Sequence, residues 1–197
     1  MQHWLAIFAF ALATTITPGP NNMMVMISGA NFGLARSMRH VLGISLGFPV
    51  MVIAVGLGLG AIIAAHPLLH RGLSYVAFAY LLYLAWKLAR AGRVDTSGVK
   101  VGRPMGFVAV ALFQWVNPKA WIMALSATAL FVQGGEEAVV SVARIVLIFA
   151  IVALPSTIAW CLFGKTIARI LDSDRRVALF NGIMAVLLVA STVPTLL

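Results

Sequence analysis

A helix-breaking stretch interrupts the first long apolar run of this chain. Residues Thr17–Asn22 read TPGPNN, and apolar residues continue on both sides, from Trp4 to about Ile27. Proline lacks the amide N–H that a helix needs and clashes with the carbonyl one turn earlier, so this stretch cannot stay helical. Inside a bilayer, backbone without helical hydrogen bonds is stable only where protein or a water-filled cavity satisfies it. The break therefore predicts a cavity within a membrane.

The composition identifies the class of protein. Hydrophobic residues make up 62% of the chain and charged residues only 10%, whereas soluble domains are about one quarter charged. Apolar runs of about 20 residues fit membrane-crossing helices, and the alternation typical of membrane β-barrels is absent. We predict an all-α integral membrane protein with one transmembrane domain, residues 1–197, in the lipid bilayer.

Six apolar runs predict six transmembrane helices, of which the first and the fourth are broken near the midplane. The breaks lie at Pro18–Asn22 and at Asn117–Lys119. The six spans are expected at about Trp4–Phe32, Val41–Ala65, Leu73–Leu88, Met105–Phe131, Val139–Phe163 and Val177–Leu196.

The basic residues predict the orientation of the chain. The net charge of +9 comes from residues between the spans, a pattern that membrane topology requires, so we expect no nucleic-acid partner. Eleven lysines and arginines lie in the first, third and fifth connections, whereas the other side has only Arg71 and Arg144. Because positive connections stay inside, we expect both termini outside the cytoplasm.

Matching prolines suggest a duplication. Pro18 in span 1 corresponds to Pro118 in span 4, and Pro49 in span 2 to Pro155 in span 5. Three spans per half require opposite orientations, so we predict an inverted 3+3 repeat around a midplane site. The first repeat covers about 1–90, a cytoplasmic linker about 91–104, and the second repeat about 105–197. The alternative is a chance coincidence of prolines, which are common in membrane helices.

The two breaks predict a binding site for an amino acid. Asn117 followed by Pro118 has the form of an N-cap and a first helical residue, and Asn21 or Asn22 can cap the half-helix after Pro20. Two helix N-termini and Lys119 favour an anion such as a carboxylate. Carbonyls before each break, with nearby threonines and Gln114, can accept from an ammonium group. The predicted substrate-binding residues are Thr17, Pro18, Gly19, Pro20, Asn21, Asn22, Gln114, Asn117, Pro118 and Lys119.

Lys119 lies near mid-depth in span 4, where an ionisable residue is expected to be functional. The alternatives are structural pairing with freed carbonyls and snorkelling to the interface. No predicted span contains Asp or Glu. A coupling proton would therefore use Lys119, bound water or the substrate's own groups.

Span 2 contains two glycine pairs, Gly43 with Gly47 and Gly56 with Gly60. Small residues four apart allow close helix packing. They fit a homodimer interface or packing against the broken helix of the same chain, and we favour the second.

Other classes of function fit poorly. We expect no catalytic residues, because no carboxylate lies at membrane depth, and no cofactor. His66 and His70 are one turn apart, but Pro67 lies between them and no further ligand is near, so we expect no metal site. A membrane oxidoreductase needs two cysteines and the chain has only Cys161. A non-transport scaffold would leave the breaks and Lys119 unexplained.

The motifs resemble a known family. Thr17–Asn22, Leu42–Gly47 and Val116–Ala120, together with the span count, are similar to the lysine exporter superfamily (LysE/RhtB type) over essentially the whole chain. Within it, Arg36-Ser37 and Leu42–Phe48 are most similar to exporters of cysteine and O-acetylserine. The resemblance implies a secondary transporter, not an enzyme, of the bacterial inner (plasma) membrane. It would export small amino acids from the cytoplasm, driven by protons. Phe48 stands where some relatives have an acid, so a proton-carrying carboxylate in span 2 is not implied here.

Overall fold

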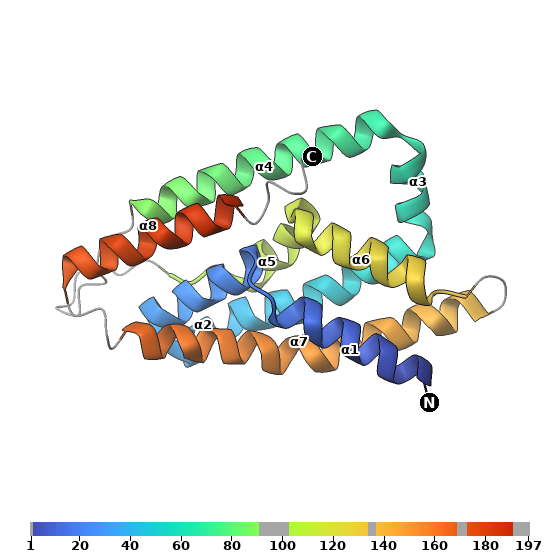
Figure 1. Ribbon diagram of the computed structural model, residues 1–197, viewed down its shortest axis with the longest axis horizontal. Helices are drawn as coiled ribbons and strands as arrows, with labels where there is room; N and C mark the ends of the chain where they lie inside the picture. Colours follow the sequence, from blue (N-terminus) through green and yellow to red (C-terminus); the bar gives the residue numbers. More distant parts are fainter. Residues whose placement is uncertain (1, 91–102, 134–136, 169–172, 191–197) are drawn as a thin grey trace.

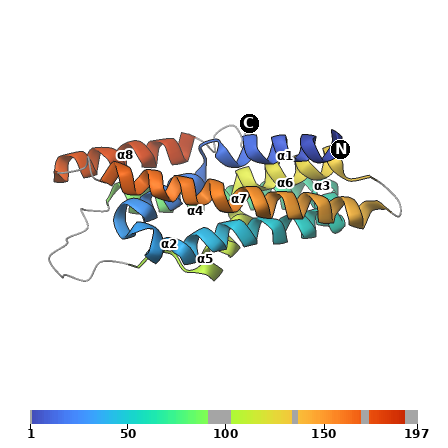
Figure 2. The same cartoon turned by 90° about the horizontal axis from the view of Figure 1, so that it is seen from below.

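The computed structural model describes residues 2–90, 103–133, 137–168 and 173–190. Every secondary-structure element in these residues is helical, and the helices form an elongated bundle (Figures 1 and 2). This confirms the predicted all-α class. Most of the predicted linker, residues 91–102, and the end of the predicted sixth span, 191–197, lie outside the described residues.

The first break is where the prolines predict it. Helix α1 (Gln2–Ile16) ends before Thr17, and α2 (Pro20–Ala54) begins with proline in its first turn. Gly19 is the N-cap residue, in an extended conformation, and no side chain caps this helix. The expectation that Asn21 or Asn22 is the cap is therefore wrong: with Pro20 at the first helical position, both asparagines already belong to the helix.

A second change of direction, not predicted from the sequence, lies within α2. Gly33 has φ 72° and ψ 172°, a left-handed conformation that only glycine adopts easily. The label α2 therefore covers two helices joined at Gly33, which correspond to the end of predicted span 1 and to span 2 (Figure 1). The second continues into a π-helical turn, Val55–Leu59, and then α3 (Gly60–Ala65).

The second break resembles the first in its use of proline. Helix α5 (Phe107–Phe113) passes through a 3₁₀ turn, Gln114–Val116, and α6 (Pro118–Phe131) starts at the next proline. The two parts are bent by 70° relative to each other. Asn117 caps α6 by accepting the Lys119 amide at 3.1 Å, as predicted.

Three longer helices complete the bundle. Helix α7 (Ala138–Ala168) packs along both α1 and α2, and Pro155 lies in its interior. Helices α4 (Pro67–Ala89) and α8 (Asp174–Ala190) lie side by side at one edge of the molecule (Figure 1). They correspond to predicted spans 3 and 6.

Glycine allows the closest helix contacts. A Cβ atom at Gly29 would collide with the Cys161 carbonyl, and one at Gly164 with the Met26 carbonyl. The span 2 glycines also pack within the chain: Gly43 and Gly47 lie against α5, and Gly60 against Leu125 of α6. The favoured interpretation, packing against the broken helix, holds for these three glycines, whereas a Cβ at Gly56 would first meet Val142 of α7.

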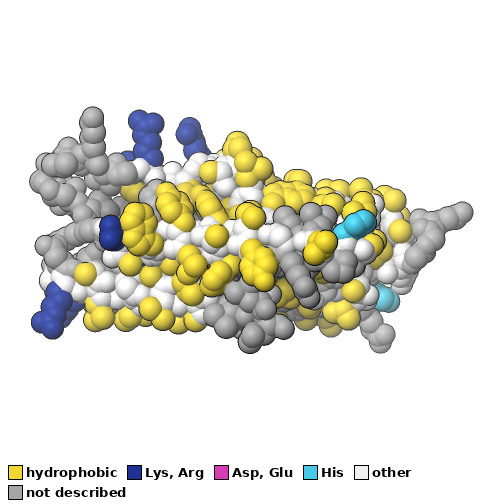
Figure 3. Space-filling model, turned by 90° about the horizontal axis from the view of Figure 1, so that it is seen from above, with side chains coloured by type: hydrophobic (Ala, Val, Ile, Leu, Met, Phe, Trp, Pro, Cys, Tyr) yellow, Lys and Arg dark blue, Asp and Glu magenta, His cyan; other side chains and the backbone are white. Residues whose placement is uncertain are grey.

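The apolar surface fits a membrane protein. Large hydrophobic side chains are exposed along the bundle, and in Figure 3 the visible lysines and arginines gather at one end, with histidines toward the other. Within the described residues, two helical stretches are long and apolar enough to cross a membrane, Pro20–Ile62 and Ala138–Ile167. The bent pair of α5 and α6 would make a third. The six-span arrangement remains a prediction.

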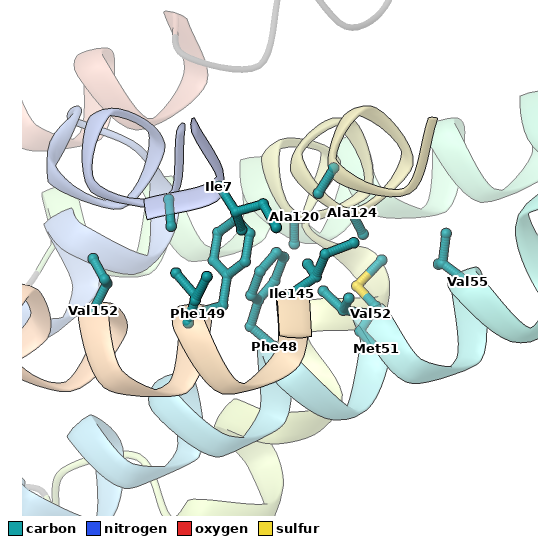
Figure 4. Packing of buried hydrophobic residues seen from close by; sticks show 13 residues of the cluster. Ile7, Phe48, Met51, Val52, Val55, Ala120, Ala124, Ile145, Phe149 and Val152 are labelled. Carbon is teal, nitrogen blue, oxygen red and sulfur yellow. The ribbon is translucent and has the colours of Figure 1, made fainter. Parts of the chain in front are cut away.

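The largest buried cluster joins α1, α2, α6 and α7 directly beside the breaks (Figure 4). Phe48 of α2 and Phe149 of α7 form its centre, with ring centroids 5.0 Å apart. This packed cluster supports the helix ends that form the site.

Candidate functional site

A cavity lies where the two helix breaks meet. Its empty volume, open solvent at the mouth included, is about 440 Å³. Among the described residues of its lining, Lys119 is the only charged side chain, and polar groups from the two breaks form one part of the wall. The lining residues are Thr14, Thr15, Gly19, Asn21, Asn22, Ile44, Phe48, Asn117, Lys119, Ala120, Met123, Ala153 and Thr157.

Five of the ten predicted site residues line this cavity: Gly19, Asn21, Asn22, Asn117 and Lys119. The other five are not among its lining residues, and two of them, Thr17 and Pro18, are exposed. Pro20 and Pro118 start the two half-helices, Gln114 is fully buried, and the carbonyls of Thr17 and Pro18 face the Lys119 ammonium.

The Lys119 ammonium connects the two breaks. Its Nζ donates to the Thr17 carbonyl at 2.7 Å, to the Thr17 Oγ1 at 2.9 Å and to the Pro18 carbonyl at 3.3 Å. Helix α6 starts at Pro118, so Lys119 leaves from its first turn and crosses to the first break. Pairing with freed carbonyls, one of the alternatives open from the sequence, is the arrangement in this structure.

Two asparagines hold the first break in place. The Asn22 amide donates to the carbonyls of Thr15 at 2.7 Å and Thr17 at 2.8 Å, so it satisfies the end of the preceding helix. Asn21 forms a reciprocal amide pair with Gln114, at 2.8 and 3.3 Å, and thereby ties the first break to the second. Gln114 also donates to the Val110 carbonyl at 2.9 Å.

The first turn of α2 leaves the amides of Asn21 and Asn22 without an acceptor inside the helix, because no helical carbonyls precede them. At α6 the Lys119 and Ala120 amides already bond Asn117. Both N-termini carry partial positive charge. Together with Lys119, they make this part of the wall suitable for an anion. No acidic side chain belongs to the described part of the lining.

Sequence reasoning missed the other part of the wall. It consists of the apolar side chains of Ile44, Phe48, Ala120, Met123 and Ala153, together with Thr157 of α7. The sequence contains a signal for these wall residues, because Phe48 directly precedes Pro49, and Ala153 and Thr157 lie two residues from Pro155. Those prolines were used only as landmarks of the repeat.

Comparisons with known proteins show to which family the chain belongs. Relatives named cysteine/O-acetylserine efflux protein are 31% identical in Salmonella typhimurium and 30% identical in Escherichia coli K12, each over 185 residues, 93% of this chain and 92% of the relative. One from Salmonella typhi is 32% identical over 186 residues, with the same coverage. No solved structure matches the chain. The family model for LysE type translocators matches residues 12–193. A helical, apolar chain with two broken helices around a cavity, matched over nearly its whole length, belongs to the LysE type translocator family.

Proposed function

We propose that this chain exports small amino acids, or close derivatives of them, across the bacterial inner membrane as a secondary transporter. The observation that carries the proposal is the cavity between the two breaks, which is lined by Lys119 and by residues at the starts of two half-helices. The names of the relatives, which describe efflux of cysteine and O-acetylserine, support the same class of substrate.

The wall chemistry favours a zwitterion with a small uncharged side chain. The breaks supply amides and an ammonium for a carboxylate, and carbonyl oxygens for an ammonium. The opposite wall, with Ile44, Phe48 and Met123, holds no charge that could neutralise a charged side chain. A buried, unpaired charge is costly, so acidic and basic amino acids should be poor substrates.

An inverted repeat is supported by matching contacts. Gly164 of α7 packs on Met26 of α2, and Gly60 packs on Leu125 of α6. Helix α1 packs on α7, and α5 packs on α2. In each case a half-helix of one repeat contacts the second span of the other, as an inverted 3+3 repeat of six spans would require. Midplane breaks in spans 1 and 4 follow from the same arrangement.

Coupling and orientation are parts of the proposal. The described part of the cavity wall has no carboxylate, so a proton would be carried by Lys119, bound water or the substrate. The basic residues at one end of the molecule (Figure 3) support a cytoplasmic linker and external termini. The single buried cysteine, Cys161, disfavours a membrane oxidoreductase, and a non-transport scaffold would not need the cavity.

Efflux of labelled compounds tests the function. Cells preloaded with labelled O-acetylserine, cysteine, lysine or glutamate are compared with and without overproduced protein. We expect faster loss of O-acetylserine or cysteine only. Equal efflux of every compound in both strains would refute the export of these substrates.

A further inference from the structure

The Lys119 ammonium occupies a set of acceptors that we call the ammonium cradle: the Thr17 carbonyl, the Thr17 Oγ1 and the Pro18 carbonyl. The Nζ lies 2.7, 2.9 and 3.3 Å from these three oxygens. An ammonium group has three N–H donors and no acceptor, so the cradle can use all three. The site is therefore complementary to a primary ammonium group as such, whichever molecule carries it.

The cradle is held in an accepting arrangement by its neighbours. The Thr17 hydroxyl donates to the Thr14 carbonyl at 2.9 Å, which leaves its oxygen to accept from the ammonium. The Asn22 amide binds the Thr17 carbonyl at 2.8 Å and fixes its direction. Nearby, the Thr15 carbonyl is occupied by Asn22 and by the Ser156 hydroxyl. The cradle oxygens, in contrast, bind the Lys119 ammonium.

The Lys119 side chain reaches the cradle over Gly19. A Cβ atom at Gly19 would lie 2.6 Å from the Lys119 Cδ and 3.0 Å from its Nζ. Gly19 and Lys119 both line the cavity. The lysine is a flexible stem with a compact charge, so its ammonium can swing from the cradle into the cavity without leaving the site.

We propose that the ammonium cradle is the subsite for the substrate's α-ammonium group, and that Lys119 occupies it as a tethered stand-in until a substrate binds. The substrate carboxylate draws the Lys119 ammonium into the cavity, and the substrate's own ammonium takes its place on the three oxygens. Both cations and the anion then remain paired, whereas binding without the exchange would leave the α-ammonium without these acceptors. The assignment of the cradle to a substrate rests on the proposed export function. The affinity of the cradle for a primary ammonium group is independent of that function.

The test removes the tethered ammonium and supplies it in solution. In Lys119→Met the charge is lost but a linear side chain remains, and n-butylammonium reproduces the missing end of lysine. Thermal melting of the purified full-length protein in detergent is followed with increasing amine. We expect a lowered Tm in Lys119→Met that n-butylammonium raises, because a ligand that binds only the folded state stabilises it. Tetramethylammonium, which has no N–H, should not raise it.

Two further variants make the result decisive. Gly19→Ala crowds the Lys119 stem while keeping its charge, and the extended backbone at this position accepts alanine. It should respond to n-butylammonium as Lys119→Met does, even if the methionine variant fails to fold. The wild type and Lys165→Met, which removes an exposed lysine of α7, should need about tenfold more amine for the same shift.

Two outcomes would overturn the cradle: equal protection by tetramethylammonium, or no protection of either Lys119→Met or Gly19→Ala by n-butylammonium. Amine protection in a protein that exports no amino acid would uphold the cradle and refute the export function. Efflux without amine protection would refute the cradle alone. The two proposals therefore fail separately.

Discussion

At the scale of single residues, one cation serves both breaks. Lys119 follows Pro118, and Gly19 holds the matching place after Pro18. The lysine side chain fills the space that any side chain at Gly19 would need. A second lysine there would collide with the first and add a like charge, so the pair of a lysine and a glycine is a packing requirement as well as a chemical one.

Truncation of the polar residues at the second break should weaken substrate binding. Lys119→Ala removes a charge-assisted hydrogen-bond donor, worth about 1.5–3 kcal/mol, which corresponds to about ten- to hundredfold in apparent affinity. Asn117→Ala removes the cap on the Lys119 amide and should cost about 1 kcal/mol. Efflux at matched expression measures both. Asn117→Ser keeps an uncharged capping oxygen and is the control. Wild-type affinity in both alanine variants would place the pocket elsewhere.

At the scale of elements, close packing of helices depends on glycine. Gly164→Ala would press a methyl group into the Met26 backbone, which has no flexible end that can move away. Overpacking of this kind costs about 1–3 kcal/mol, so we expect a lower Tm in detergent. Gly182→Ala on α8, where a Cβ meets nothing within 4 Å, is the matched control. Equal Tm values for the two variants would show that α2 and α7 do not pack this closely.

The prolines at the breaks should affect turnover more than binding. In Pro18→Ala and Pro118→Ala the preceding helix can grow through the break, which takes free amides out of the cavity wall. We therefore expect a lower maximal efflux rate in addition to weaker binding, measured with the same preloaded cells. Pro67→Ala, which changes a proline at the start of α4 and not at a break, should keep the wild-type rate. A normal rate in both break variants would mean that the breaks do not depend on proline.

Local chemistry explains what could be predicted from the sequence. Both breaks and the Asn117 cap follow from proline and asparagine within a few residues of each other, and all three are confirmed. The turn at Gly33 was missed because its signal is one glycine with positive φ, in a run that otherwise reads as helix. The apolar wall with Phe48 and Met123 was missed because it arises only when α2, α6 and α7 pack together.

At the scale of the whole molecule, the layout follows from where polar groups can be satisfied. Large apolar side chains are exposed along the bundle, whereas the Lys119 ammonium and the carbonyls of the first break bond one another where the two breaks meet. In hydrocarbon, backbone groups need such internal partners. The cavity is thus the place where the fold can contain irregular backbone, and it is also the place where a polar substrate can be held.

The orientation of this layout can be measured directly. The first, third and fifth connections carry eleven lysines and arginines and the other side only Arg71 and Arg144, so we expect the linker inside and both termini outside. In a Cys161→Ala background, which removes the only cysteine, Ser97→Cys and a cysteine added after Leu197 are exposed to a membrane-impermeant thiol reagent on intact spheroplasts. Only the C-terminal cysteine should react before lysis, and both after it. Labelling of Ser97→Cys alone before lysis would reverse the orientation, and with it the side from which the cavity loads its substrate.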